Sequence, residues 1–256
     1  MIKKSFILAV LVLGLLLIAI SVSPLFLVVR EFVIDSKINS RYEFKGINNR
    51  NISEQGSQSL NHPIKWEGNV VEILTEDTGK AVSNLVINNQ VKHKVFIKVV
   101  INGMEIYPTS EAWLAPNSII EGRVLSWLNI VEIKDNVSNE TYLAIIQRLS
   151  GDWLKGENIT THVESQKWRV ISIHRNKELK EETFSYTERG DHLLGVKLIQ
   201  LSSQSSSLIG YKSDLPYRNP SIYFPVVYPL SSCLIGLILL IVGFIIKYKV
   251  NNHSRL

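Results

Sequence analysis

Two apolar runs without a charged residue flank the central part of the chain, and between them the pattern changes to short alternating segments. The first run covers residues 5–29 and the second covers residues 226–246. Each is long enough to cross a hydrocarbon core of roughly 30 Å as a helix. The pattern therefore predicts two transmembrane helices with a separate domain between them.

The first run has an alternative interpretation as a cleaved signal peptide. Lys3 and Lys4 form a basic leader, and Ala19-Ile20-Ser21 resembles a small-residue cleavage site. The apolar run continues past that site to Val29, which a mature soluble terminus has no reason to carry. We therefore favour a retained helix, and cleavage remains the alternative.

The second run carries small residues at spacings of four and seven. Ser232, Gly236 and Gly243 fall close to one face of a helix, where a second helix can approach closely. The sequence predicts that this face packs against the first span or against a partner. The alternative is that Gly and Ser are simply frequent in spanning helices.

Strict alternation of apolar and polar residues marks the segment 91–107 as a strand pair. Its apolar positions include Val95 and Ile97, and its other face carries lysines. Asn102-Gly103 supplies the residue pair that most readily adopts positive φ in a two-residue hairpin turn. We predict a hairpin with a solvated lysine face, and a packed, hydrogen-bonded His93 on the apolar side.

Strand patterns dominate the rest of the central region, and helices are few. The best helix candidate is 140–149, and 175–182 fits either a short charged helix or a hairpin tip. The predicted fold class is a membrane-anchored α+β protein, mainly β, with one or two short helices. The further strand candidates are 64–74, 84–87, 119–127, 129–134, 167–173, 183–187 and 192–201.

The domain organisation follows from these patterns. A helical extension of the first span and a polar linker precede the β-rich domain, and a Ser/Pro-rich juxtamembrane spacer follows it. The predicted boundaries are a tail at 1–4, a helix at 5–29, the extension and linker at 30–61, the β-rich domain at 62–201, the spacer at 202–225, a helix at 226–246 and a tail at 247–256.

The distribution of charge predicts the orientation. The chain has 28 Lys and Arg against 23 Asp and Glu, and five of the basic residues lie in the two tails, which contain no acid. Lys and Arg in short flanks mark the cytoplasmic side. Both tails are therefore expected in the cytoplasm of an inner membrane, with an extracytoplasmic domain of zero formal charge. That neutrality argues against a nucleic-acid partner.

The sequence offers no recognisable catalytic chemistry. A single Cys forms no intramolecular disulfide, and the histidines are scattered without metal-ligand or nucleophile spacing. We accordingly predict no catalytic residue, no cofactor and no metal site.

Two tryptophans are candidates for a partner-binding surface. Trp113 and Trp153 lie in loop-like contexts, where an exposed ring is suited to protein recognition. Core packing is the alternative for both.

The function expected from these features is non-enzymatic. The extracytoplasmic domain binds a membrane protein partner, or a second copy of the chain, as an accessory or structural subunit. One alternative is an envelope sensor that signals through contacts between transmembrane helices. A second is an envelope hydrolase whose site is assembled from residues far apart in the sequence.

Overall fold

The computed structural model describes residues 4–46, 60, 62–87, 90–120, 124, 127–150, 166–202, 209–214 and 223–253. The chain divides into two compact units. The first combines Met1–Asp35 with Leu208–Leu256, and the second is Ser36–Ser207.

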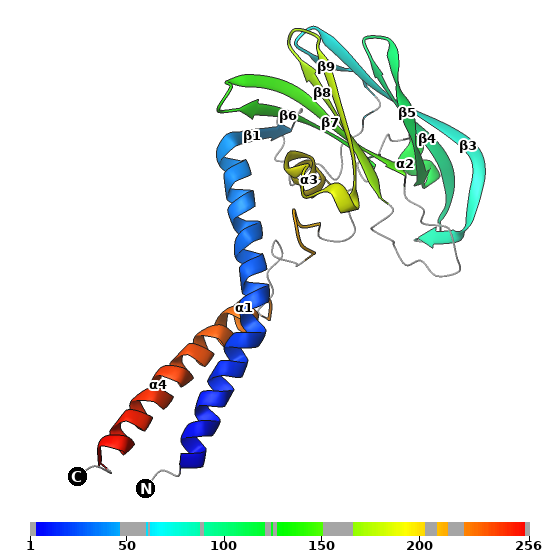
Figure 1. Ribbon diagram of the computed structural model, residues 1–256. Helices are drawn as coiled ribbons and strands as arrows, with labels where there is room; N and C mark the ends of the chain where they lie inside the picture. The colour runs from blue at the N-terminus through cyan, green and yellow to red at the C-terminus, as the bar shows by residue number, and fades with distance from the viewer. Residues whose placement is uncertain are drawn as a thin grey trace. The chain divides into compact units, whose positions relative to one another are not determined.

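The first unit is built on two long helices, α1 (Lys4–Arg41) and α4 (Ser232–His253), and Figure 1 shows both chain termini at the same end of this pair. A kinked segment, η4 (Val226–Ser231), in which Tyr228 has extended backbone angles (φ −130°, ψ 126°), leads into α4. Both helical segments are long and apolar enough to cross a membrane. The prediction of two long apolar helices flanking a β-rich region is therefore confirmed.

The second unit contains two antiparallel sheets. The five-stranded sheet has the order β1-β6-β7-β8-β9, and the four-stranded sheet has the order β2-β3-β4-β5. The first consists of β1 (Tyr42–Gly46), β6 (Leu128–Asp135), β7 (Glu140–Ser150), β8 (Lys167–His174) and β9 (Leu179–Ser185). The second consists of β2 (Ile64–Trp66), β3 (Asn69–Ile87), β4 (Gln90–Ile101) and β5 (Met104–Leu114). Short helices are α2 (Pro116–Ile120), η3 (Tyr186–Glu188) and α3 (Leu193–Gln200).

The five-stranded sheet is covered on both faces. Arg169 of β8 lies on one face and reaches carbonyl oxygens of β5 in the other sheet. Its neighbour Val170 lies on the opposite face, beneath Gly195 of α3. A Cβ atom on Gly195 would come within 2.5 Å of the Phe184 ring, so glycine is what allows α3 to pack this closely. Figure 1 shows α3 against this sheet.

The predicted hairpin with the Asn102-Gly103 turn is confirmed as β4 and β5. Both turn residues have positive φ, at 52° and 80°. The apolar positions Val95 and Ile97 are fully buried, and the lysines alternate with them on the other face.

Two segments have the opposite secondary structure to the one predicted. The helix predicted at 140–149 is wrong, because these residues form β7. The strand predicted at 192–201 is also wrong, because Leu193–Gln200 is the helix α3. Residues 142–148 are all buried, since both faces of β7 are covered. A strand buried on both faces loses its alternation and is easily confused with a buried helix.

Two further predictions need correction. The strand at 64–74 is broken by a turn at Glu67-Gly68 with positive φ at both residues, and β3 continues to Ile87. The strand at 119–127 is wrong where it is described: its first two residues end α2, which begins at Pro116, and Trp127 lies in a turn. The helix α1 runs beyond the apolar segment to Arg41, and Tyr42 then pairs with Asp135 in β1. The segment 175–182 adopts the hairpin-tip alternative and enters β9.

Candidate functional site

The small residues predicted as a packing face contact α1 in the structure. A Cβ atom on Gly236 would lie 2.8 Å from the carbonyl oxygen of Gly14 on α1. A Cβ atom on Gly243 would lie 2.6 Å from Leu11. The two backbones therefore approach each other at Gly236, and at Gly243 the Leu11 side chain packs directly against the α4 backbone, so a larger residue at Gly236 would separate the helices.

Hydroxyl groups extend the same contact toward the start of α4. The Oγ atoms of Ser21 and Ser232 are 2.7 Å apart, and Ser21 is fully buried. One turn earlier, the Tyr228 hydroxyl donates a hydrogen bond to the carbonyl oxygen of Ile20 at 2.8 Å. In an apolar surrounding, such polar atoms need a partner within the helix pair.

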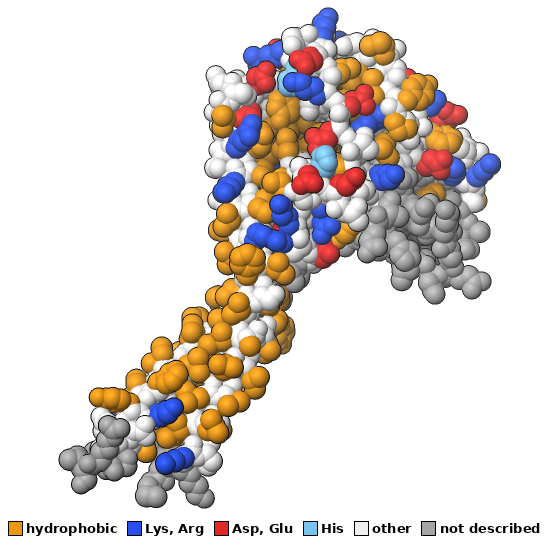
Figure 2. All heavy atoms as spheres, viewed as in Figure 1, with side chains coloured by type: hydrophobic (Ala, Val, Ile, Leu, Met, Phe, Trp, Pro, Cys, Tyr) orange, Lys and Arg blue, Asp and Glu red, His pale blue; other side chains and the backbone are white. Residues whose placement is uncertain are grey.

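Large apolar side chains cover the outside of the helix pair, as the orange surface in Figure 2 shows. A soluble protein seldom leaves so large an apolar area in contact with water. The exposed residues include Phe6, Val12, Leu16, Phe26, Leu234, Ile238, Ile241 and Phe244.

A second contact in the first unit, which we call the Glu31 clasp, holds residues 209–214 against α1. The Glu31 carboxylate is 0% exposed and accepts hydrogen bonds from the backbone N–H groups of Tyr211 at 2.6 Å and Lys212 at 2.9 Å. The Tyr211 hydroxyl donates to Asp35, one helical turn later, at 2.6 Å. A Cβ atom on Gly210 would lie 1.9 Å from the Ser213 carbonyl oxygen, so the turn requires glycine.

The Glu31 clasp was not predicted from the sequence. Residues 209–214 fall inside the segment predicted to be a spacer, and Glu31 falls inside the predicted helical extension, where it was assigned no role. The available signal was the spacing of Glu31 and Asp35, which places both carboxylates on one face of the helix.

The outward face of the four-stranded sheet carries mixed apolar and charged side chains, and we call it the sheet B face. Lys94, Phe96 and Lys98 of β4 alternate with buried residues and so point outward together. Leu74 lies directly opposite Lys98, and Trp113 lies opposite Lys94, so both share this face. Large apolar and aromatic groups are therefore interleaved with lysines.

Acidic partners neutralise the lysines of the sheet B face. Lys98 pairs with Glu76 at 2.8 Å, and Lys94 pairs with Glu111 at 2.7 Å. The hydrogen bond to Glu76 is the main reason that the pKa of Lys98 is raised above its usual value. This face has no strong net charge and is not suited to a polyanion.

The two predicted tryptophans have different outcomes. Trp113 is half-buried and meets the ring of Trp127 edge-on, with 5.5 Å between ring centroids. Trp127 also carries the buried guanidinium of Arg148, 4.7 Å from its ring, and burial lowers the pKa of Arg148 to about 10. Trp153 lies outside the described residues. The contact with Trp127 thus holds the Trp113 ring in place at the border of the sheet B face.

A buried arginine joins the two sheets of the second unit. Arg169 is 1% exposed and donates hydrogen bonds to the carbonyl oxygens of Tyr107 and Pro108 and to Gln147. These carbonyls belong to a bulge in β5, where three residues lie opposite one residue of β4, so the strand ladder leaves them without partners. Burial lowers the pKa of Arg169, and the nearby carboxylate of Glu181, 3.6 Å away, partly opposes this shift.

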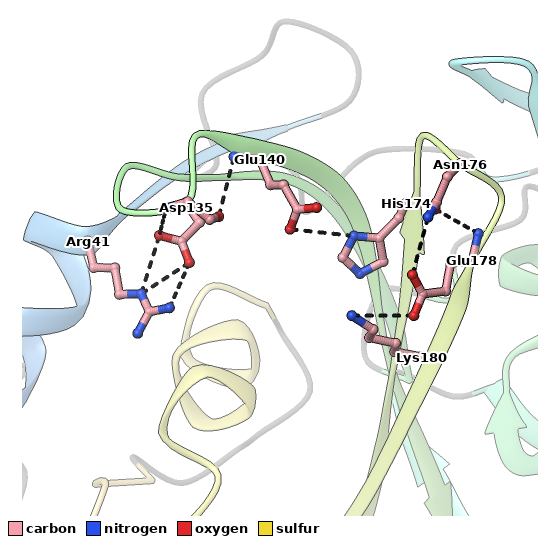
Figure 3. A network of polar contacts seen from close by, with 8 residues as sticks. Arg41, Asp135, Glu140, His174, Asn176, Glu178 and Lys180 are labelled. Atoms are coloured by element: carbon pink, nitrogen blue, oxygen red, sulfur yellow. Dashed lines mark hydrogen bonds and ion pairs between the residues drawn. The ribbon is translucent and has the colours of Figure 1, made fainter.

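Figure 3 shows a polar network at one end of the five-stranded sheet. Arg41 donates three hydrogen bonds to Asp135, at 2.8, 3.1 and 3.3 Å. The Asp135 carboxylate also accepts the backbone N–H of Val137 at 2.9 Å. These bonds, those of Arg41 first, lower the pKa of Asp135. The carboxylate is fixed in its charged form, which suits a structural ion pair better than proton transfer.

The same network contains one of three pairings between a histidine and a carboxylate among the described residues of the second unit. His174 lies 4.0 Å from Glu140, and its ring stacks on Tyr142 with 5.1 Å between centroids. His93 contacts Asp77 at 2.8 Å, and His192 contacts Glu182. Sequence spacing did not reveal these pairs, because their partners lie on other strands or loops. In the described part of the chain, no three His, Cys, Asp or Glu side chains gather as a metal site.

Comparison with known proteins adds no family assignment. No protein family model matches the chain, and neither a curated protein nor a solved structure is significantly similar to it.

Proposed function

We propose that this chain is a two-span membrane protein without enzymatic activity, whose β-rich domain binds a protein partner as an accessory or structural subunit. The observation that carries the membrane part is the helix pair: its three glycines and the Ser21–Ser232 pair face inward, and most of its large apolar side chains face outward. That arrangement suits lipid as the surrounding medium, since close packing by small residues is how helices associate there.

The proposed orientation places both termini in the cytoplasm and the β-rich domain outside it. Its support is the restriction of the tail charges to Lys and Arg. The proposed location is the cytoplasmic membrane.

The sheet B face is the proposed partner surface. Leu74 is half-exposed, and Trp113 and Phe96 are partly exposed beside it among paired charges. Aromatic anchors within a rim of satisfied polar groups are typical of protein interfaces. The neutralised lysines favour a protein partner over nucleic acid or an anionic surface.

The test is co-purification of the intact tagged chain from its own membranes in mild detergent. We expect a stoichiometric membrane partner, and L74E should reduce its recovery by about tenfold, because a charge placed in an apolar contact leaves it unpaired. The control is V137E: Val137 is 77% exposed in the β6–β7 turn, away from this face.

Two tagged versions of the chain, expressed together, separate the two kinds of partner. Recovery of one tag with the other identifies a second copy as the partner. Isolation of the chain only as a monomer, or equal loss of the partner in L74E and V137E, would contradict the proposal.

A further inference from the structure

A hollow of about 300 Å³ opens between α1 and α4 at the end of the helix pair where both termini lie. Its lining is Lys4, Ile7, Leu8, Leu11, Lys247, Val250 and Asn251. This volume is at the lower end of the range of ligand pockets, roughly 300–1,000 Å³.

The hollow continues the packing face of the two helices. Gly243 touches Leu11, and the α4 residues at four and seven positions further along are Lys247 and Val250. On a helix these positions share one face. The helices thus pack at Gly243, and beyond it the larger side chains of both inner faces border an open space instead of meeting.

The lining combines two cations with an apolar surface. Lys4 of α1 and Lys247 of α4 border the same hollow, together with Ile7 and other aliphatic residues. The sequence holds no Asp or Glu at residues 1–30 or 223–256, so no acidic side chain of either spanning segment or tail neutralises them. Figure 2 shows Lys or Arg side chains at this end and an otherwise apolar surface along the visible part of the helix pair.

We propose that this hollow binds one anionic phospholipid, with the phosphate at Lys4 and Lys247 and an acyl chain along the aliphatic lining. Basic pockets between spanning helices on the cytoplasmic side suit anionic headgroups, and a lysine near the surface contributes about one kcal/mol to such binding. A free phosphate satisfies only the two cations, whereas a lipid also covers the apolar wall. The inference rests on the proposed membrane insertion of the two helices.

The experiment uses the full chain in a neutral detergent and native mass spectrometry. The probes are dioleoylphosphatidylglycerol, dioleoylphosphatidylcholine and glycerol 3-phosphate, which is the water-soluble headgroup alone. We expect one phosphatidylglycerol retained per chain, at least about tenfold tighter than phosphatidylcholine, and no competition from glycerol 3-phosphate. A preserved signal in K4Q/K247Q would overturn the site.

Single variants provide matched charge controls. K4Q and K247Q should each weaken phosphatidylglycerol binding by about fivefold. K249Q removes the same charge from an exposed position on α4 outside the lining and should leave the affinity unchanged. Equal loss of phosphatidylglycerol affinity in all three variants would mean that the basic tails attract anionic lipid in general, and would overturn the site.

Reconstitution into phosphatidylcholine vesicles separates this inference from the proposed function. If the chain fails to insert and remains removable by carbonate wash, the membrane proposal fails. If the chain inserts but retains both lipids equally, only the lipid site fails.

Discussion

The helix pair and the β-rich unit place the same residue types in opposite positions. Ile97 of β4 is 0% exposed, whereas Ile235 of α4 is 51% exposed. Small residues form the inside of the helix pair, and aliphatic and aromatic side chains form the inside of the β-rich unit. The difference is what the proposed membrane insertion requires, because lipid favours apolar side chains on the outside of the first unit and water favours them on the inside of the second.

The buried polar groups where the two helices meet differ from those between the two sheets; the buried Glu31 carboxylate of the first unit lies outside the helix contact and accepts hydrogen bonds from the backbone of residues 209–214. In the helix pair a hydroxyl pair, Ser21 with Ser232, lies inside the contact. In the β-rich unit the group between the sheets is a full charge, Arg169, surrounded by carbonyl oxygens. A large domain that packs two sheets can supply the several acceptors that a buried guanidinium requires, and two helices in contact at glycine cannot.

The largest expected effect comes from removing the buried cation. R169M leaves Gln147 and the bulge carbonyls without a donor and should destabilise the β-rich unit by about 3–5 kcal/mol. All five tryptophans lie within residues 36–207, so thermal unfolding followed by tryptophan fluorescence reports on this unit alone. R175M removes a solvent-exposed ion pair with Glu67 and is the control, with an expected change below about 0.5 kcal/mol. Equal unfolding temperatures for R169M and the parent chain would contradict the role of Arg169 in holding the two sheets together.

One truncation made in both units tests the comparison directly. I97A should cost about 2–5 kcal/mol in the fluorescence-monitored unfolding, because it leaves a cavity between the sheets. I235A removes the same atoms from an outward position on α4 and should leave that transition unchanged. A large effect of I235A on the same transition would contradict the division into two units.

The glycine contact is tested by cross-linking. In a C233S background, S21C and S232C replace the two hydroxyls that lie 2.7 Å apart, and we expect rapid disulfide formation on mild oxidation. G236L should slow it by about tenfold, because overpacking of this size typically costs 1–3 kcal/mol. I235L, on the exposed side of the same turn, should leave the rate unchanged. An unaltered rate in G236L would show that the helices do not meet at this glycine.

The smallest expected effect concerns pH. The native pKa of Asp135 is lowered by Arg41, so this ion pair stabilises the folded state above the carboxyl's unfolded pKa of about 3.9. Its contribution is lost as the pH falls below that value. D135N should therefore remove part of the decrease in the urea midpoint between pH 5 and pH 3. An unchanged pH dependence in D135N would assign the decrease to other carboxylates.

Sequence patterns predicted the features that depend on residues near each other in the chain. The two apolar helices and the Asn102-Gly103 hairpin are of this kind, because length and turn chemistry alone define them. The strand β7 was predicted as a helix and the helix α3 as a strand. Their true types could not be predicted, because they depend on which faces of each element the rest of the domain covers. The histidine–carboxylate pairs and the Glu31 clasp join residues distant in sequence, and only the fold brings them together.

The Glu31 clasp binds residues 209–214 to α1 shortly after the chain returns from the β-rich unit, and Asp35 is the last residue of the first unit before the chain enters the second. The point where the chain leaves the first unit and the point where it returns are therefore neighbours. The whole stretch between them is a long loop whose ends the Glu31 clasp holds together. The entropic cost of closing a loop rises only slowly with the length of the loop, by about 0.6 kcal/mol for each doubling. The helix pair should therefore tolerate an inserted domain of quite different size with little loss of stability, provided that residues 31–35 and 209–214 are kept.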